Sequence, residues 1–244
     1  MQNFNNSVAE LRALIEAIGE SYKSHPLFDD ITVPEPSLPK DELFFTRLVA
    51  WGYVLLNEAF PVCLKQIIGV MRQSNPEMHK HYQHTRDIID SLRTFQSHNL
   101  PSTSKRNEDR IRDIDIWKIN NGGSPFSWEV SCDSLCQSIN KVICDLRSVW
   151  NNISSDQDDK EVFLESLSLA FNNDWPAYLF DELVERSAFS IGLKDFDATG
   201  FRKYKGNVDN WRKIAALFSE RESAKEAVER AIKRDLISIF GSDD

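Results

Sequence analysis

The chain has 244 residues, of which 41% are hydrophobic and 11% aromatic, a composition typical of globular proteins and not of disordered ones. It is long enough to bury a substantial core, either as one large domain or as one domain with a smaller partner. The net charge of −9 and the pI near 5.1 argue against a protein that coats nucleic acid non-specifically, because that affinity comes mainly from neutralised phosphates. An enzyme acting on RNA would need a local basic patch.

Three features of the sequence predict a cytoplasmic protein. No run of eighteen apolar residues is present, so we expect no membrane span. The first residues, MQNFNNSVAELRAL, lack the basic start and apolar core of a signal peptide. The cysteines lack the paired CxxC spacing of a zinc site, and we interpret all four as small buried residues in a reducing compartment: Cys63, Cys132, Cys136 and Cys144.

The first part of the chain predicts a helix and then an extended connection. Residues 7–23 begin with a serine that can cap a helix, and they carry one apolar stripe. The prolines that follow cannot continue a helix and favour a chain that runs extended over the surface: Pro26, Pro34, Pro36 and Pro39. Residues 1–40 are therefore expected to flank the main bundle.

The next segment predicts helices at the centre of a bundle. Asp41 is a plausible cap for residues 42–60. These residues are apolar nearly all round, which suits a helix buried in a core or covered by a partner. Pro61 kinks or ends this helix, and residues 62–73 continue as a further helix.

Residues 78–98 predict a helix whose end carries an arginine and a histidine. Its apolar side chains recur at helical spacing on one face, at Ile88, Ile89, Leu92 and Phe95. Asn99 and Pro101 then stop the helix, because the residue before a proline avoids the helical region. Five positions turn a helix by roughly 140°, so Arg93 and His98 point apart unless the last turn opens. The predicted helix end supplies that opening.

The stretch Arg93-Thr-Phe-Gln-Ser-His98 resembles the motif of the HEPN superfamily. These are small helical-bundle proteins, and their ribonuclease members carry an arginine and a histidine separated by a few residues of any kind. The resemblance implies RNA cleavage without a metal or cofactor, in which the histidine serves in proton transfer and the arginine binds the scissile phosphate. It also implies a homodimer with both pairs at one interface, and it points to a toxin or a phage-defence effector.

Two further residues are candidates for a supporting role in this site, although the first of them departs from the family pattern. Thr94 stands directly after the arginine, at a position that is often Asn, Asp or His in the family. Glu58 lies on the most apolar predicted helix, where a charged group needs a partner. Arg93 on a neighbouring helix is one candidate for that partner, and a solvated helix edge is the alternative.

The remaining histidines have simpler interpretations. Arg72 and His79 also match the motif, but an Asn-Pro pair within that match predicts a turn between helices. His79, His81 and His84 form a cluster, yet positions two and five apart do not share a helix face, and no acidic or cysteine partner stands at the usual spacing. We expect solvated or interface histidines and no metal site.

Residues 99–125 predict an irregular insertion that contains the densest basic cluster near His98: Lys105, Arg106, Arg110 and Arg112. This cluster is the candidate RNA-binding surface. Nearby carboxylates nearly cancel its charge, at Glu108, Asp109, Asp113 and Asp115, so a self-paired, solvated helix or loop is the favoured interpretation. An Asn-Asn-Gly-Gly signal at 120–123 predicts a turn.

Residues 127–152 predict a second strong core helix. Its apolar side chains lie largely on one face, at Val130, Leu135, Ile139, Val142, Ile143, Leu146 and Val149. If the resemblance holds, a HEPN-like bundle covers residues 41–153, and its members are the four helices 42–60, 62–73, 78–98 and 127–152.

A polar run, SSDQDD at 154–159, predicts a domain boundary. The C-terminal helical region, 154–244, then contains helices at 161–172, 208–218 and 220–239. A further helix is expected to start at the cap and early-turn proline of Asp174-Trp175-Pro176 and to end near residue 187.

Residues 192–207 predict an irregular segment with glycines and cations. Phe201 and Tyr204 alternate with these cations, as at a single-stranded nucleic-acid surface. The alternative, which we favour, is a loop whose aromatic side chains plug the helical core.

The sequence thus predicts an all-α fold and leaves three functions open. The preferred one is a metal-independent endoribonuclease of the HEPN kind, with RNA as substrate. The main alternative is a catalytically silent helical module that binds a regulatory protein, and the third is a nucleotide-sensing bundle. The enzyme requires Arg93 and His98 to converge on a solvent-open cleft, whereas the module allows them to point apart or into salt bridges.

Overall fold

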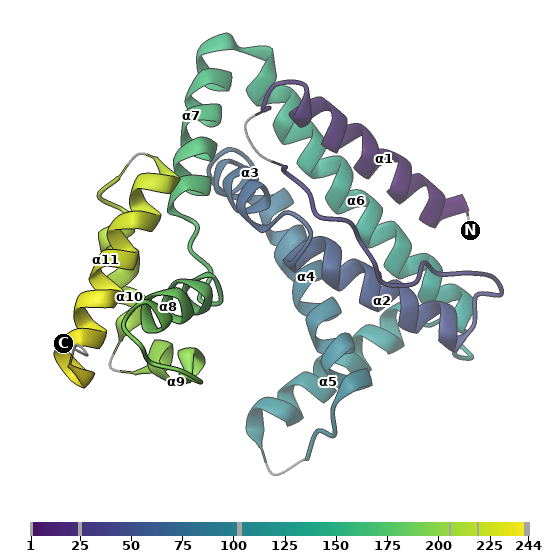
Figure 1. Cartoon of the computed structure of the whole chain (residues 1–244). Helices are drawn as coiled ribbons and strands as arrows, with labels where there is room; N and C mark the ends of the chain where they lie inside the picture. The colour runs from purple at the N-terminus through teal and green to yellow at the C-terminus, as the bar shows by residue number, and fades with distance from the viewer. Residues whose placement is uncertain (1, 24–25, 102–103, 205, 219, 242–244) are drawn as a thin grey trace. The chain divides into compact units, whose positions relative to one another are not determined.

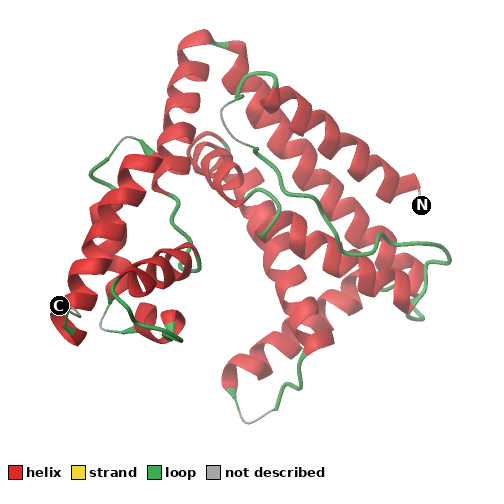
Figure 2. Cartoon of the chain, viewed as in Figure 1, coloured by secondary structure: helices red, strands yellow, loops and turns green. Residues whose placement is uncertain are grey.

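A computed structural model describes residues 2–23, 26–101, 104–204, 206–218 and 220–241. Within these residues the regular structure consists of eleven α-helices without a strand, so the predicted all-α fold is confirmed (Figure 2). The chain forms two compact units, residues 1–164 and 165–244. The division falls inside a helix, a few residues beyond the polar run at 154–159.

The first unit contains six helices and the start of a seventh (Figure 1). They are α1 (Gln2–Gly19), α2 (Glu42–Asn57), α3 (Pro61–Ser74), α4 (Pro76–Ser97), α5 (Lys105–Asn121), α6 (Trp128–Ser155) and α7 (Gln157–Asn173), which crosses into the second unit. The second unit adds α8 (Leu179–Ser190), α9 (Ala198–Lys203), α10 (Asn207–Ala215) and α11 (Arg221–Phe240).

Helix α6 is the centre of the first unit, because α1, α2, α3, α4 and α5 all pack against it. Its buried face includes Leu135, Ile139 and Leu146, as the sequence predicts. Val130 is the exception among the predicted core residues, since it lies exposed in the first turn of the helix.

Helix α1 belongs to the same unit, and it starts five residues before the predicted helix because Phe4 is buried. The Phe4 ring meets the edge of Trp51 on α2, with centroids 5.0 Å apart. Glu10 pairs with Arg147 on α6 across 2.6 Å. The N-terminal helix is therefore an integral layer of the bundle, running alongside α6 (Figure 1).

The junctions around α2 follow the predicted signals. Residues 26–40 contain no helix, and the Asp41 carboxylate caps α2 by accepting the Phe44 N–H at 3.0 Å. Pro61 is the first residue of α3. No single described helix is long and apolar enough to cross a membrane; α2 and α3 pass that test only as a pair, and they are bent by 77° at their junction.

Helix α5 replaces most of the irregular insertion predicted over 99–125, and it decides between the two forms, helix or loop, that were left open for the charged residues. Residues 102–103 lie outside the described part, but Lys105–Asn121 is helical. Ile114 and Trp117, three residues apart, are buried against the bundle, and the Trp117 ring lies 5.8 Å from that of Phe45. Dense charges had masked this apolar spacing. The predicted turn follows at Gly122, which ends the helix, and at Gly123, whose φ of 77° favours glycine.

Helix α4 buries Ile88, Ile89 and Leu92, as predicted. Phe95 does not join them: it is 44% exposed in the last turn of the helix. Its ring instead lies 5.2 Å below the Lys118 ammonium of α5. The predicted apolar stripe therefore ends one turn early, because α5 meets α4 there with a cation.

The second unit is organised around aromatic side chains. Trp211 of α10 lies between Phe180 and Phe201, with ring centroids 5.3 and 6.1 Å away. Phe201 is buried, so it plugs this core as the favoured interpretation of residues 192–207 predicts, whereas Tyr204 is exposed. The segment also contains the six-residue helix α9. Lys205 lies outside the described residues.

The start of α8 differs from the prediction. The Asp174-Trp175-Pro176 sequence does not cap the helix, which begins at Leu179 without a side-chain cap. Trp175 is buried instead: its Nε1 donates to the Asn172 carbonyl at 3.0 Å, and its ring stacks on Phe180. Burial of the indole holds the chain in turns before the helix can start.

Replacing Trp211 by alanine is expected to lower the free energy of unfolding by about 3–5 kcal/mol, because a fully buried tryptophan side chain is removed from this core. Trp211→Phe should cost less than about 1.5 kcal/mol. Its smaller volume is offset because Nε1 has no hydrogen-bond partner among the described residues, and a buried unpaired donor costs about 1–3 kcal/mol. Hydrogen exchange of the α8 and α11 amides measures both losses; equal losses would contradict this account.

Candidate functional site

Arg93 of α4 is half-buried against α2. Its guanidinium carbon lies 4.6 Å from the centre of the Tyr53 ring. Among the described residues, no ion pair engages this arginine. A guanidinium on an aromatic ring gains about 0.5–1 kcal/mol and keeps N–H donors at its edge, so Arg93 is a positioned cation that can bind an anion.

A second arginine lies on the same side of α4. Arg86 donates from Nε to the Asn57 carboxamide oxygen at 2.8 Å. Arg86 and Arg93 are two turns apart on α4, and they contact Asn57 and Tyr53, one turn apart on α2. The strip between α2 and α4 therefore holds two arginines, neither of which pairs with a carboxylate in the described part of the chain. Arg86 was not among the predicted site residues, although its spacing of seven from Arg93 places both on one side of the helix.

His98 lies directly after α4. The helix ends at Ser97, and His98 has extended backbone angles, φ −134° and ψ 147°. Its backbone N–H donates to the Thr94 carbonyl at 3.0 Å, and its side chain is exposed. The predicted end of the helix is confirmed at this position. In the described chain, no hydrogen bond or ion pair joins His98 to Arg93, and neither residue lines the pocket between α4 and α5.

The two supporting residues, Thr94 and Glu58, make no side-chain contact with Arg93 or His98 among the described interactions. Thr94 is half-buried and contributes the carbonyl that receives the His98 N–H. Glu58 is exposed at the end of α2, so the structure places it at a solvated helix edge. Arg93 lies over Tyr53 and forms no described ion pair with Glu58.

The basic cluster lies on α5 and is partly neutralised. Arg110 pairs with Asp90 of α4 across 2.8 Å, and Arg112 lies 3.0 Å from Asp109 of its own helix. Lys105 and Arg106 are exposed in the first turn. Within the described structure, Lys105 and Arg106 form no ion pair. They are therefore the two residues of the cluster that could contact a phosphate backbone without breaking an existing ion pair.

The second match to the motif is split between two helices. Arg72 lies in the last turn of α3 and His79 in α4. Asn75 separates the helices, and its side chain caps α4 by accepting the Met78 N–H at 3.2 Å. The predicted turn is confirmed, which leaves Arg93 and His98 as the pair on one helix and its end.

The histidine cluster is dispersed along α4. No group of three potential metal ligands is brought together within the described residues. His81 faces α6, where its Nδ1 lies 3.7 Å from the buried Asp145 carboxylate, and Lys141 also pairs with that carboxylate at 2.8 Å. Burial lowers the pKa of His81 from its ordinary value of 6.5; the Lys141 charge lowers it further, and Asp145 opposes them.

Stability is expected to fall as the pH drops through 6.5. The pKa of His81 is lowered in the folded state, so between the folded and unfolded pKa values the unfolded chain binds more protons, and the free energy of unfolding rises with pH there. This contribution is fully present above the unfolded pKa. Denaturant unfolding at about pH 7.5 and about pH 5.5 gives the free energy of unfolding at each pH. The decrease between the two pH values should be smaller for His81→Gln than for the wild type. Equal losses would exclude His81 as a source.

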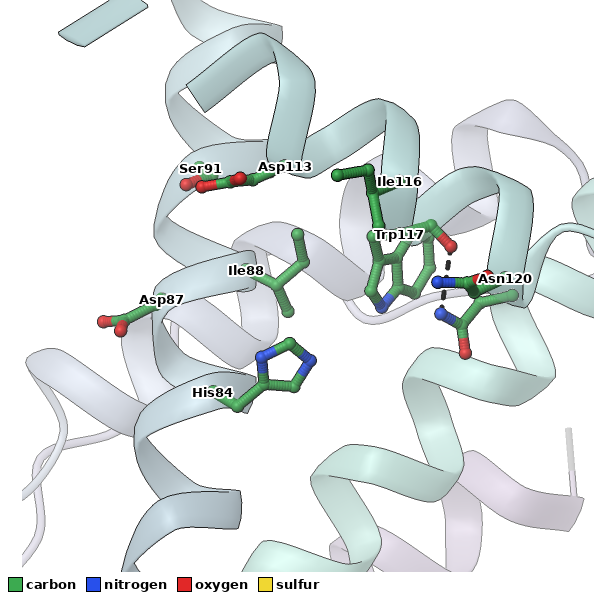
Figure 3. Close-up of a pocket in the computed structure, with 9 residues that line it drawn as sticks. His84, Asp87, Ile88, Ser91, Asp113, Ile116, Trp117 and Asn120 are labelled. Atoms are coloured by element: carbon green, nitrogen blue, oxygen red, sulfur yellow. Dashed lines mark hydrogen bonds between the residues drawn. The ribbon is translucent and has the colours of Figure 1, made fainter. Parts of the chain in front are cut away.

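A pocket of about 370 Å³ lies between α4 and α5 (Figure 3). Helix α4 lines it with His84, Asp87, Ile88 and Ser91, and α5 lines it with Asp113, Ile116, Trp117, Asn120 and Asn121. The four α4 residues follow one another at intervals of three, one and three positions, and so do the first four α5 residues. This spacing places each set on one face of its helix. Local sequence does not reveal this pocket, because its lining comes together only when α5 packs as a helix against α4.

The cysteines are all free, and three of them are buried as predicted. Burial raises the pKa of Cys63 to about 12, so this thiol stays protonated. Cys144 is a correction: it is exposed on α6, because it follows Ile143 on the side of the helix that turns away from the core.

Comparison of the chain with protein-family models, with curated proteins and with solved structures gave no match.

Proposed function

We propose that the protein is a metal-independent endoribonuclease in which Arg93 binds the scissile phosphate and His98 transfers protons. The observation that supports this function most directly is the state of Arg93. It is half-buried, held over Tyr53 and without a carboxylate partner among the described residues, five positions before a histidine exposed at the helix end. Arg86 and its contact with Asn57 extend the same cationic strip.

The reaction needs a base, an acid and a group that stabilises charge. The 2′-hydroxyl loses its proton to the base and attacks the adjacent phosphorus, while the bond to the 5′ oxygen breaks and that oxygen receives a proton from the acid. Arg93 donates hydrogen bonds to the phosphoryl oxygens as negative charge gathers on them. The products carry a 2′,3′-cyclic phosphate and a 5′-hydroxyl, and no metal takes part.

A homodimer is part of the proposal because one chain supplies only one histidine at this place. Two copies of His98 provide a base and an acid. Arg93 and His98 of one chain also share no described contact, which suits a site composed from two chains. An isologous dimer around the end of α4 brings both pairs together.

The test is cleavage of a mixed RNA pool by the purified full chain in EDTA, beside His98→Ala. The wild type should release fragments with 2′,3′-cyclic phosphate ends, and the variant should not. Absence of cleavage by the wild type, or equal cleavage by both proteins, would contradict the proposal.

A second function, a catalytically silent interaction module, is favoured by one observation. Helix α5 exposes two large apolar side chains, Ile116 at 49% and Ile119 at 77%. Such side chains mark contact surfaces when they adjoin one another. The RNA assay separates the two functions, since a module leaves RNA intact.

A further inference from the structure

The pocket between α4 and α5 carries two formal negative charges and no arginine or lysine in its lining, and His84 is its one titratable base. Asp87 comes from α4 and Asp113 from α5. Arg110 pairs with Asp90, and Arg112 is shared between Asp109, at 3.0 Å, and Asp113, at 3.8 Å. Asp113 therefore has one longer ion pair at the surface, whereas Asp87 has none among the described residues, and the pocket keeps an acidic character.

Polar and apolar side chains occupy different parts of the pocket lining. Figure 3 shows Asp87, Ser91 and Asp113 on one side and Asn120 on the other, with Ile88, Ile116 and Trp117 between them. Asn121 donates from Nδ2 to the Trp117 carbonyl at 2.9 Å, which fixes this end and leaves its carboxamide oxygen as an acceptor. The acceptors thus lie at both ends of an apolar middle section.

We propose that this pocket binds a small organic cation: an amine or guanidinium on a short apolar body. The carboxylates attract the charge, Ile88 and Trp117 contact the alkyl part, and the carboxamide end accepts a second donor. The volume of about 370 Å³ lies in the range of small-molecule sites, about 300 to 1,000 Å³. The site is separate from Arg93 and His98, neither of which lines it.

The same lining excludes a nucleotide as the preferred ligand. Phosphates next to Asp87 and Asp113 would meet like charge, and no arginine, lysine or helix N-terminus in the lining compensates it. An organic cation without phosphate groups is instead attracted by both carboxylates. The pocket therefore distinguishes amines from phosphates by charge alone.

Calorimetric titration of the full chain with agmatine, spermidine and ATP tests the proposal. At least one of the two cations should bind saturably, and ATP should not. Asp113→Asn should weaken cation binding by about 10-fold, because one of the two carboxylates becomes neutral. Binding should also weaken as salt is added, since an open site is screened.

The matched control is Asp115→Asn, which removes the same charge from the same helix at an exposed position outside the pocket. It should leave cation affinity within about two-fold of the wild type, because its charge is separated by solvent. Several results would overturn the proposal: no saturable binding of either cation, equal weakening by both variants, or tighter binding of ATP than of the cations. Because the readout is binding, it is independent of RNA cleavage.

Discussion

Replacing His98 with alanine is expected to lower the rate of RNA cleavage by about 10²- to 10⁴-fold, the usual contribution of a general acid or base. Stability should change by less than about 0.5 kcal/mol, because the side chain is exposed and the helix-ending hydrogen bond uses the backbone N–H. Initial rates on a fluorescent RNA, with unfolding curves of both proteins, separate the two effects.

Asn99→Ala is the control, since Asn99 is the exposed neighbour of His98. It should retain the wild-type rate of cleavage. A parallel fall in both variants would mean that the end of α4 matters only for shape, and the assignment of proton transfer to His98 would fail.

Mixing the two inactive proteins His98→Ala and Arg93→Ala extends this result to the dimer. If each site takes its arginine from one chain and its histidine from the other, mixed dimers keep one intact pair and some activity returns. A mixture as inactive as its components would exclude this arrangement of the two chains.

Replacing Phe45 with alanine is expected to lower the free energy of unfolding by about 3–5 kcal/mol. The Phe45 ring is buried and lies 5.8 Å from Trp117 of α5 and 5.4 Å from Trp128 of α6. Its loss leaves a cavity where three helices meet and removes the support of Trp117, which also lines the α4–α5 pocket. Denaturant unfolding followed by far-ultraviolet circular dichroism measures the loss.

Phe95→Ala is the matched control, because it removes the same side chain from an exposed position. The substitution removes the contact with the Lys118 ammonium from a side chain that is 44% exposed, so the cost should stay below about 1 kcal/mol. Similar losses for both variants would show that the junction of α2, α5 and α6 is not the packed core described above.

The helix end that carries the candidate site could be predicted from local sequence. Pro101 prevents Leu100 from being helical, and the chain accordingly leaves the helix at His98. The contact of Arg93 with Tyr53 could not be predicted, because it depends on which turns of α2 and α4 lie next to each other when the two helices pack. The expected partner Glu58 was chosen by charge, whereas packing put an aromatic ring in reach.

The pocket was lost to sequence reasoning for a related reason. The carboxylates of this segment were expected to pair with nearby cations in a solvated helix or loop, and Arg112 does pair with Asp109 and Asp113. Burial of Trp117 against Phe45 also packs this helix on the bundle, which turns Asp113 towards α4. A local charge pattern cannot reveal that a neighbouring helix will cover one face.

The sequence by itself determined the helical class, the positions of α2, α3, α4 and α6, and the stop after residue 97. Each of these follows from apolar spacing, caps and prolines within a few residues. The tertiary structure alone decided that α5 is a helix and not a loop, that Arg86 and Arg93 of α4 share one strip against α2, and that two polar helix faces enclose a pocket. These depend on contacts between residues distant in the chain, which periodicity does not encode.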